Sequence, residues 1–488
     1  MTASVNFVGF VMKQMTNAQF GMIGLGTMGR NFLLNVAEQG FACAGFDIDP
    51  AKRSLLLAEG EGMKITAGSD LADFLSQMAT PRNIMLLVPA GPIVDSVIAD
   101  LLPHLSPGDL VIDGGNSHFP DTERREAIVN EYGFEFIGVG VSGGEEGARH
   151  GASIMVGGKP EVYERVRPIF EAASAKVNGE PCAAHVGRGS AGHFVKMAHN
   201  GIEYAMMQLI AEAYDLLKRG FGMTAAEIAE LFAEWNSAEL NSFLMEISAT
   251  VLRKTDGETG NPLVEMILDT AGQKGTGKWT SQAAMDLGVP IPTIDSAVTM
   301  RQISARKSER VAAATSLGIS MPLEVDAALR EDGIGFVRAG LHLGFLTAYA
   351  QGMAMLRAAS EEKGFELDMV EIAKIWRGGC IIRAAMLEDI RIAFAAEPSL
   401  ANLLYAPNFR EMIPREHALL KAFVHFAVST DIPCMAAAAS VNYLRAFATE
   451  RLPANLIQAQ RDYFGAHTYQ RIDKEGMFHT PDWENPNG

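Results

Sequence analysis

The stretch Phe20-Gly21-Met22-Ile23-Gly24-Leu25-Gly26-Thr27-Met28-Gly29 decides how the amino-terminal part of the chain folds. Its first four residues predict a buried strand, and its glycines are spaced Gly-x-Gly-x-x-Gly before a helical stretch from Arg30 to Gln39. In this strand–turn–helix context, backbone amides and the positive end of the helix dipole can face a pyrophosphate. The stretch therefore predicts a dinucleotide site that includes Gly24, Gly26, Thr27, Met28 and Gly29.

The next strand supports this interpretation. It is predicted over Phe41–Phe46 and ends at Asp47, where an acid can accept hydrogen bonds from the ribose hydroxyls of a dinucleotide. The alternative is a glycine turn packed without a ligand, which the combined motif disfavours. We also assign to the cofactor site three residues that follow later strands, Val88, Ala90 and Asn116.

Further strands and helices alternate along the first 190 residues. Such alternation predicts a mostly parallel, doubly wound sheet whose ligands lie beyond the carboxyl ends of its strands. Glycine-rich loops, which let a backbone approach a ligand closely, follow two of these strands. The expected strands are Ile84–Val88, Leu110–Ile112 and Phe134–Val139, the expected helix is Ile93–Leu102, and the loops are Asp113–Ser117 and Ser142–Gly147.

The segment Gly192–Tyr204 opens a long apolar run in which four polar residues are spaced i, i+3, i+4 and i+7. If the run is helical, Lys196, His199, Asn200 and Glu203 share one face. Burying a charge is costly unless it is paired or neutralised, so this face indicates a functional site. A structural, salt-bridged face with a satisfied histidine has the same spacing, and spacing alone does not separate the two interpretations.

Long amphipathic segments dominate after residue 190, which predicts a helical domain. They are Ala225–Trp235, Ala238–Arg253, Ser296–Leu317, Val337–Ser360 and Met369–Leu387. We therefore expect a Rossmann-type α/β domain over residues 1–190, of which 1–18 are an extension, and a large all-α domain over residues 191–448. Residues 449–488 form a carboxyl-terminal tail that is too small to fold alone and is expected to dock on its own domain or on a partner subunit.

Composition restricts the class of protein. The 488 residues are 48% hydrophobic and 20% charged, as in an ordinary globular protein, and the net charge of −17 argues against a nucleic-acid partner. An anionic substrate must then be held by a local basic cluster. Four scattered cysteines and the lack of an apolar run of membrane-spanning length predict a cytoplasmic protein without a structural zinc site.

The segment Gly272–Trp279 almost fits a P-loop. Trp279 stands where the Mg²⁺-binding Ser or Thr belongs, and no strand is predicted before it, so a nucleoside triphosphatase is rejected. Two lysines and free backbone amides still suit this loop to a phosphate group.

Several segments together resemble the decarboxylating 6-phosphogluconate dehydrogenases. The longest is Pro453–His467, for which chance agreement is implausible, and the wider β-hydroxyacid dehydrogenase superfamily has much shorter chains. The other matching segments are Asp113–Ser117, Val141–Gly144, Gly192–Tyr204, Gly272–Thr280 and Trp376–Arg383, with the longest extending over Leu452–Tyr469.

The resemblance implies oxidation of 6-phospho-D-gluconate at C3, loss of CO2 and release of ribulose 5-phosphate, a step of the pentose phosphate pathway and of gluconate utilisation. It makes Lys196 the general base and Glu203 the acid that protonates C1, with no metal required. Burial agrees with both roles, since it lowers the pKa of a lysine and raises that of a glutamate.

The resemblance also implies a substrate site shared within a homodimer. His199 and Asn200 orient the reacting groups, and a basic cluster surrounds the substrate, two of its members reaching in from the other subunit. The implied substrate contacts are Asn116, Ser142, Gly143, Gly144 and Tyr204, and the cluster is Lys274, Arg301, Arg461 and His467, of which the last two come from the tail.

The second strand departs from the family pattern. Most well-known members use NADP and end this strand in Asn-Arg-Thr, whereas this chain reads Asp47-Ile48-Asp49, and Pro89 replaces a lysine that usually follows the third strand. A carboxylate suits the ribose diol of NAD and repels a 2′-phosphate, so we expect NAD to be preferred. Lys52 and Arg53 leave NADP possible.

Two other classes of protein stay open at this stage. One is a dehydrogenase of another 3-hydroxy acid, which has no use for a phosphate-binding cluster. The other is a non-catalytic, dinucleotide-sensing regulator, which needs only the amino-terminal loop.

Overall fold

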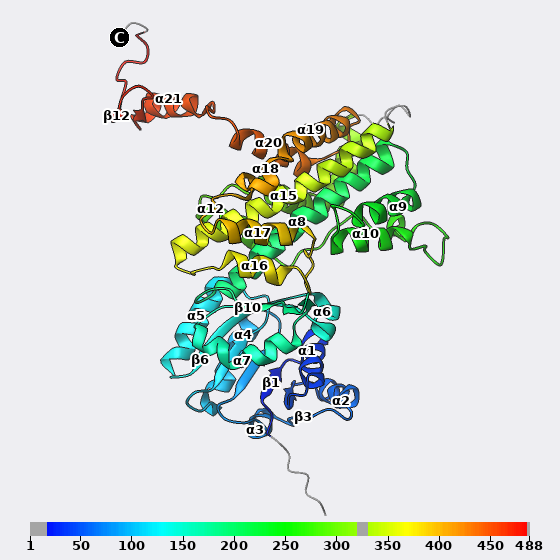
Figure 1. Ribbon diagram of the computed structural model, residues 1–488, viewed down its shortest axis with the longest axis vertical. Coiled ribbons are helices and arrows are strands. Elements are labelled where there is room, and N and C mark those ends of the chain that lie inside the picture. Colours follow the sequence, from blue (N-terminus) through cyan, green and yellow to red (C-terminus); the bar gives the residue numbers. More distant parts are fainter. Residues whose placement is uncertain (1–16, 320–329, 486–488) are drawn as a thin grey trace, which may run out of the picture.

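A computed structural model describes residues 17–319 and 330–485. The predicted extension lies almost wholly outside these residues. The sheet-containing part and a larger helical part stack along the long axis of the molecule, and the last helix extends away from both (Figure 1).

Within the described residues, eight strands form the main sheet in the order β10-β7-β6-β5-β4-β1-β2-β3. Neighbouring strands run parallel except β6 and β7, which confirms the mostly parallel sheet. The strand order reverses between β1 and β4, the usual position of a dinucleotide site. The strands are β1 Phe20–Ile23, β2 Cys43–Phe46, β3 Ile65–Ala67, β4 Asn83–Leu86, β5 Leu110–Asp113, β6 Glu135–Ser142, β7 Ser153–Val156 and β10 Ala183–His185.

Helices cover both faces of this sheet, and each face has its own apolar core. On one side, the rings of Phe20, Phe32 and Phe170 meet with centroids 6.2–6.4 Å apart. On the other, Phe74 and Val94 belong to a separate buried cluster. The helices are α1 Thr27–Glu38, α2 Pro50–Glu59, α3 Leu71–Ser76, α4 Pro92–Leu101, α5 Phe119–Glu131, α6 Gly144–His150 and α7 Pro160–Ala173.

The helical part is built around α8, which runs over Ala191–Asp215. This helix is buried along most of its length because α12, α13, α15 and α20 pack around it, and it also contacts β6 and β7. It therefore joins the two parts of the molecule. The other helices are α9 Ala225–Asn236, α10 Phe243–Arg253, α11 Leu263–Met266, α12 Thr276–Asp286, α13 Pro292–Ser304, α14 Lys307–Ser316, α15 Arg330–Lys363, α16 Met369–Trp376, α17 Met386–Ala396, α18 Pro407–Arg410, α19 Ile413–Ser429 and α20 Met435–Phe447.

Two predicted helices are each divided in two. The expected helix over 369–387 ends at Trp376, because Gly379 adopts a φ of +65° and its carbonyl accepts a hydrogen bond from Ser153 N of β7 at 2.8 Å. The expected helix over 296–317 breaks after Ser304, whose carbonyl accepts a hydrogen bond from the Arg310 guanidinium at 3.1 Å. Tertiary contacts thus override helical periodicity at both positions.

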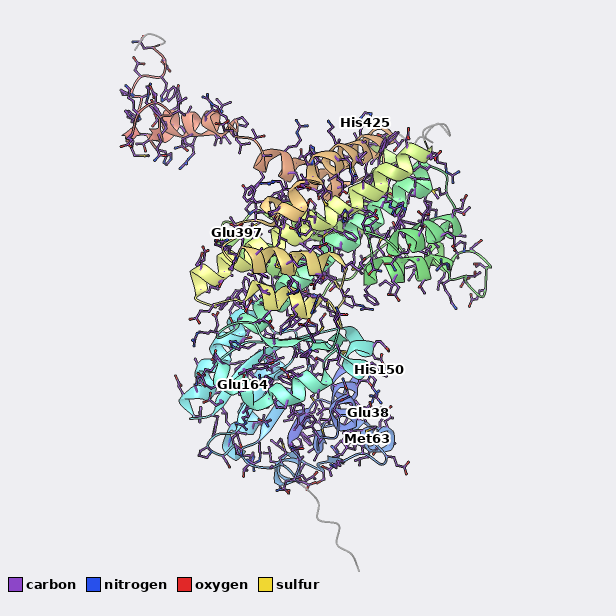
Figure 2. All side chains as sticks on the ribbon, viewed as in Figure 1. Glu38, Met63, His150, Glu164, Glu397 and His425 are labelled. Atoms are coloured by element: carbon purple, nitrogen blue, oxygen red, sulfur yellow. The ribbon has the colours of Figure 1, made fainter. Side chains whose placement is uncertain are left out.

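The tail forms α21 (Ala454–Gly465) and a small hairpin of β11 (Tyr469–Gln470) and β12 (Met477–Phe478). Asp462 organises it by accepting hydrogen bonds from Thr468 N, Thr480 N and Trp483 Nε1 at 2.9–3.1 Å. Figure 2 shows the tail side chains standing apart from those of the rest of the chain. The tail therefore does not dock on its own domain.

Candidate active site

The turn between β1 and α1 has three glycines with three different surroundings. Gly24 has a φ of +96°, and a Cβ there would lie 2.5 Å from the Leu87 carbonyl oxygen. A Cβ at Gly29 would lie 1.9 Å from the Gly24 carbonyl oxygen, so this glycine allows the helix to pack on the strand. At Gly26, a Cβ would meet no described atom within 4 Å. The backbone at Gly26, with the uncapped amino end of α1 behind it, is open to a phosphate group.

A cavity of about 270 Å³ lies beside this turn, at the reversal of strand order. Asp47 occupies one wall, where its carboxylate accepts hydrogen bonds from Leu25 N at 2.8 Å and Asp49 N at 3.0 Å. Lys52 Nζ lies 3.4 Å from the same carboxylate. The rest of the lining is mainly apolar and includes Ile48, Leu71, Val88, Pro89, Ile93 and Val97, with Asp100 at its edge.

A second cavity, of about 610 Å³, opens between the sheet edge and the helical part. It brings together predicted site residues that are far apart in the sequence. Its lining includes Asn116, Lys196, Asn200, Glu203, Tyr204, Gly272, Gln273, Lys274, Thr276 and Arg301.

Lys196 is buried at the base of this cavity. Its Nζ donates to Asn200 Oδ1 at 2.8 Å and to Ser142 Oγ at 3.1 Å, and lies 3.3 Å from His199 Nδ1. These partners are neutral, since burial also holds the pKa of His199 well below its usual value. Burial lowers the pKa of Lys196, against a smaller opposing effect of Glu203. The site therefore favours an uncharged amine, as a general base requires.

Glu203 lies two turns beyond Lys196 on the same face of α8. Burial raises the pKa of its carboxyl group, and the charges of Lys196 and Arg301 oppose that rise. His199 Nδ1 lies 3.9 Å from a Glu203 oxygen, so the histidine stands between the two titrating groups. The polar face predicted from spacing is thus confirmed, with two groups whose pKa values are shifted toward their neutral forms.

Arg301 and Lys274 supply positive charge at the opposite wall. The Arg301 guanidinium lies 3.6 Å from the centroid of the Tyr204 ring and donates to the Gly272 carbonyl at 2.9 Å. These contacts join α13 to α8 and to the loop that precedes α12. That loop bears Lys274, and its cationic side chain lines the cavity.

The loop after β6 closes the site behind Lys196. Ser142 binds Lys196, and its Oγ also lies 3.3 Å from His199 Nε2. Gly143 has a φ of +116°, and a Cβ there would lie 2.6 Å from the Gly379 carbonyl oxygen, so only glycine fits between the loop and the turn after α16. Gly144 then begins α6.

Arg461 and His467 are the predicted site residues that the chain does not bring to its own cavity. Arg461 is on α21 and His467 follows it, in the part of the tail that extends away from the molecule (Figure 1). Among the cofactor residues, Thr27 and Met28 begin α1, Val88 lines the smaller cavity, and Ala90 follows it in the same loop.

Gln273 and Thr276 line the larger cavity but are absent from the predicted set. Both belong to the segment Gly272–Trp279, which the sequence assigned to a phosphate group because of its two lysines. Their own side chains are neutral, so charge did not indicate that they bind an anion. Their place in that loop, next to Lys274, is the signal that could have found them.

The described residues contain neither a membrane-spanning helix nor a metal-binding cluster. No helix in residues 17–319 or 330–485 has the length and apolar character needed to cross a membrane. No cluster of His, Cys, Asp and Glu side chains in the same ranges is arranged to hold a metal ion.

Comparisons with known proteins agree with this geometry. Residues 19–187 match the family described as the NAD binding domain of 6-phosphogluconate dehydrogenase, and residues 192–483 match its C-terminal domain. The NADP(+)-dependent, decarboxylating 6-phosphogluconate dehydrogenase of Bacillus subtilis is 49% identical over 96% of this chain and 99% of its own. The decarboxylating enzyme of Escherichia coli gives the same values.

A solved structure resembles the whole molecule. It is the Plasmodium falciparum 6-phosphogluconate dehydrogenase, described as apo and in complexes with NADP+ and with 6-phosphogluconate, and it covers 95% of this chain and 100% of its own with 40% identity and a TM-score of 0.92. Both family matches, the full-length similarity and the shared fold lead to one conclusion: this chain belongs to the decarboxylating 6-phosphogluconate dehydrogenase family.

Proposed function

We propose that this protein oxidises and decarboxylates 6-phospho-D-gluconate to ribulose 5-phosphate and CO2, with reduction of a nicotinamide dinucleotide. The observation that carries the proposal is the 610 Å³ cavity, in which Lys196 and Glu203 share space with Lys274 and Arg301. An acid–base pair beside two cations suits a phosphorylated sugar acid better than a hydroxy acid without a phosphate group.

Lys196 acts first, as the general base. Its neutral amine takes the proton of the C3 hydroxyl. A nicotinamide dinucleotide, which the Gly24–Gly29 turn and Asp47 would hold, would supply the hydride acceptor for C3. The ammonium that results then faces the new keto oxygen and stabilises the negative charge that develops as CO2 departs. Asn200 and Ser142, which accept hydrogen bonds from Lys196 Nζ, keep that nitrogen in place.

Glu203 acts second, as the general acid. Loss of CO2 leaves an enediol whose C1 must be protonated, and burial, by raising the pKa of Glu203, favours the protonated carboxyl group that this step needs. Lys196 passes its proton to the keto oxygen as the enediol forms and takes the hydroxyl proton back as the ketone forms. It returns to its neutral form when that proton passes to the Glu203 carboxylate, which gave its own proton to C1. The two residues lie two turns apart on one face of α8, so one rigid helix fixes both proton transfers.

The substrate is held by groups around the reacting carbons. Lys274 and Arg301 pair with its anionic groups, and Asn116, Tyr204 and the Ser142–Gly144 loop contact its hydroxyl and carboxylate oxygens. Arg301 is held in place by Tyr204 and by the Gly272 carbonyl, so it is preorganised for this role.

NAD is the preferred cofactor. The 270 Å³ cavity carries two carboxylates, Asp47 and Asp100, against one lysine, and this balance disfavours a 2′-phosphate. Arg53 is not among the residues that line this cavity, and its guanidinium donates to the Asp47 carbonyl at 2.6 Å. Apolar side chains, among them Ile48 at 89% exposure, offer a surface for the adenine ring.

The active unit is a homodimer in which the tail of each subunit completes the site of the other. Arg461 and His467 belong to that tail, whose Leu456, Ile457 and Phe464 are 60–71% exposed in the single chain. A surface this apolar is expected to be covered by protein. The proposed division of the chain is residues 1–190, 191–448 and 449–488.

The test is to incubate the protein with 6-phosphogluconate and each dinucleotide while recording absorbance of the reduced cofactor and CO2. Equimolar CO2 and reduced cofactor are expected, with a higher kcat/KM for NAD. Reduction without CO2 would refute the decarboxylation, and a higher kcat/KM for NADP would refute only the cofactor preference.

A further inference from the structure

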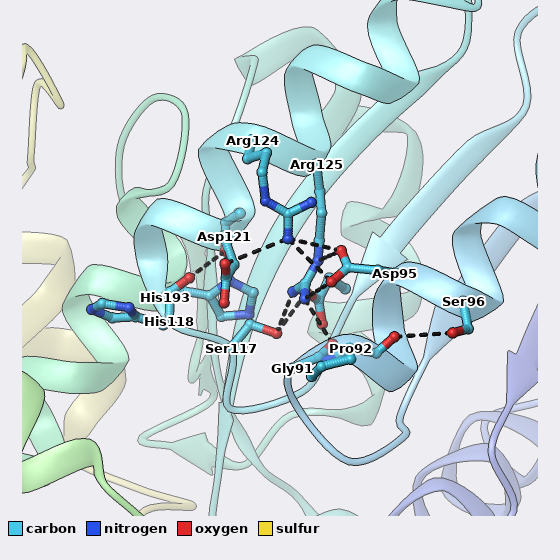
Figure 3. A network of polar contacts seen from close by, with 12 residues as sticks. Gly91, Pro92, Asp95, Ser96, Ser117, His118, Asp121, Arg124, Arg125 and His193 are labelled. Carbon is cyan, nitrogen blue, oxygen red and sulfur yellow. Dashed lines mark hydrogen bonds and ion pairs between the residues drawn. The ribbon is translucent and has the colours of Figure 1, made fainter.

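A buried arginine links the two loops that meet above the sheet. The Gly91 loop (residues 87–91) follows β4, and the Asn116 loop (residues 114–118) follows β5. Arg125, on α5, is 1% exposed and lies between them. Figure 3 shows its guanidinium surrounded by acceptors from three elements.

Every N–H of this guanidinium has an acceptor. Its Nε donates to Asp95 Oδ1 at 2.8 Å, and Nη2 donates to Asp95 Oδ2 at 3.3 Å and to the Gly91 carbonyl at 2.9 Å. Its Nη1 donates to Asp113 Oδ2 and to Ser117 Oγ, both at 3.1 Å. Five donors therefore meet five acceptors, a match that only the planar fork of arginine offers.

One of the two loops borders the cofactor site. Val88 and Pro89 line the 270 Å³ cavity. A Cβ at Gly24 would lie 2.5 Å from the Leu87 carbonyl oxygen, so the Gly91 loop also supports the dinucleotide turn.

The other loop borders the substrate site. Asn116, next to Ser117, lines the 610 Å³ cavity. Asp113 fixes the loop from its start, because its carboxylate accepts hydrogen bonds from Gly115 N at 3.1 Å and Ser117 Oγ at 2.7 Å. Arg125 donates to the same Asp113 oxygen and to the same Ser117 hydroxyl. It therefore contacts one residue before Asn116 and one residue after it.

The helix that bears Arg125 is also bonded to the catalytic helix. Thr122 Oγ1 lies 2.7 Å from His193 Nδ1, and Ser190 Oγ donates to Glu123 Oε1 at 2.9 Å. His193 is on α8, one turn before Lys196. Helix α5 therefore contacts the Gly91 loop, the Asn116 loop and the start of α8.

We propose that Arg125 is a positioning residue that holds the Gly91 loop and the Asn116 loop in one fixed arrangement, and thereby sets Asn116 against both cofactor and substrate. It touches neither ligand. The expected change in turnover of 6-phosphogluconate rests on the proposed function. The expected loosening of the two loops does not. Loss of the guanidinium weakens dinucleotide binding and substrate turnover together, because one side chain serves both loops.

The neighbouring residue provides a matched control. Arg124 also binds Asp95, at 2.9 Å and 3.1 Å, but its side chain is 48% exposed and contacts neither loop. Arg125→Lys keeps the charge and loses the fork, whereas Arg124→Gln removes a charge of the same helix.

In Arg125→Lys we expect kcat/KM for 6-phosphogluconate to fall about tenfold to a hundredfold, since displacements near 1 Å have effects of this size. The Kd for the dinucleotide, measured by calorimetry without substrate, should rise about tenfold, and Arg124→Gln should stay within about twofold of wild type. A lower Tm in Arg125→Lys with kcat/KM and Kd unchanged would overturn the proposal, because that is the result of a purely structural role.

Hydrogen exchange in the unliganded protein tests the same point without turnover. Arg125→Lys should speed amide exchange in residues 87–91 and 114–118 and leave α7 unchanged. This result would hold even if 6-phosphogluconate proved not to be the substrate, whereas unchanged exchange in both loops would refute the positioning role alone.

Ser117→Ala provides a second variant if Arg125→Lys does not fold. It removes one acceptor on the substrate side only. We expect faster exchange in residues 114–118 and about a tenfold rise in KM for 6-phosphogluconate. Wild-type exchange and KM in Ser117→Ala would contradict the proposal.

Discussion

Lys196 is surrounded by groups that hydrogen-bond without neutralising it. Asn200, Ser142 and His199 lie within 2.8–3.3 Å of Nζ, while Glu203 is reached only across His199. A carboxylate in direct contact would favour the ammonium form. Because these partners are neutral, burial has the largest effect on the pKa of Lys196 and lowers it.

Replacing Lys196 with arginine tests this environment. Arginine keeps a positive charge but does not lose its proton, so kcat/KM for 6-phosphogluconate should fall by about 10³-fold or more. In the wild type, kcat/KM should rise with pH through the pKa of Lys196, because the neutral amine is the active form and burial lowers that pKa. Rate profiles from pH 5 to 10 measure both effects.

Lys218→Arg is the matched control, since this lysine lies just beyond α8 and pairs with Glu265 at 2.8 Å. It should retain wild-type kcat/KM. Substantial turnover by Lys196→Arg with an unchanged pH profile would exclude Lys196 as the base.

Asp47→Asn tests the basis of cofactor choice. Leu25 N and Asp49 N donate to different oxygens of Asp47, so asparagine keeps an acceptor for one of them, and it removes the charge that faces a 2′-phosphate. The ratio of kcat/KM for NAD to that for NADP should fall about tenfold. Asp49→Asn, which alters the cap of α2 instead, should leave the ratio near its wild-type value. If Asp47→Asn has the wild-type ratio of kcat/KM for NAD to that for NADP, the charge of Asp47 does not determine the cofactor preference.

At the scale of elements, α8 is attached to α20 through a buried carboxylate. Glu212 is 2% exposed and accepts hydrogen bonds from Ala436 N and Ala437 N, each at 2.9 Å, at the amino end of α20. Burial raises the pKa of Glu212 to about 7, although these N–H donors and Gln208 oppose the rise. Helix α8 and helix α20, which leads to the tail, are thus joined by a buried carboxyl group whose pKa is raised to about 7.

This contact predicts a pH-dependent stability. Because the pKa of Glu212 is about 7 in the folded state against 4.5 for a free side chain, the folded state binds the extra proton between these values. Its contribution to the free energy of unfolding is complete below pH 4.5 and is lost as pH rises through 7. At about 1.4 kcal/mol per pH unit, the change is about 3 kcal/mol.

Glu212→Gln should remove this dependence. Chemical denaturation of wild type and variant from pH 4.5 to 8 measures the difference between their free energies of unfolding, which should shift by about 3 kcal/mol in favour of the variant over the range. Glu411→Gln, at an exposed position near α19, is the control and should give a constant difference. Parallel curves for Glu212→Gln and wild type would show that this carboxyl group does not titrate as proposed.

At the scale of the whole molecule, the cavity and the tail of one chain are separate. A site completed by the tail of a second subunit predicts complementation between two inactive variants. Lys196→Met removes the base, and Arg461→Ala removes a tail cation, which should lower kcat/KM about tenfold to a hundredfold. In a heterodimer of the two, one site carries both defects and the other carries neither.

Co-expression with two affinity tags gives the pure heterodimer. Its kcat should be about half that of the wild-type dimer, far above either variant homodimer. A heterodimer no more active than the mean of the two homodimers would mean that each chain completes its own site. Sedimentation of the wild type gives an independent check, since a fully active monomer is incompatible with a shared site.

The local geometry of the site could be predicted from sequence. Gly24, Gly26 and Gly29 occupy one turn, and Lys196 to Glu203 span two turns of one helix, so their relative positions follow from backbone geometry alone. The resemblance to a family then supplied Lys274 and Arg301, which no local pattern connects to α8. Gln273 and Thr276 were missed because their neutral side chains resemble those of any loop.

The sequence by itself thus determined the dinucleotide turn, the polar face of α8 and the division into a sheet and a helical part, because each depends on residues close together along the chain. Only the tertiary structure decided where predicted helices end, as at Gly379 against β7, and which buried side chain joins two loops, as Arg125 does. It also decided that α21, which bears Arg461, extends away from the rest of its own chain (Figure 1). These features depend on contacts between distant residues, and periodicity carries no information about such contacts.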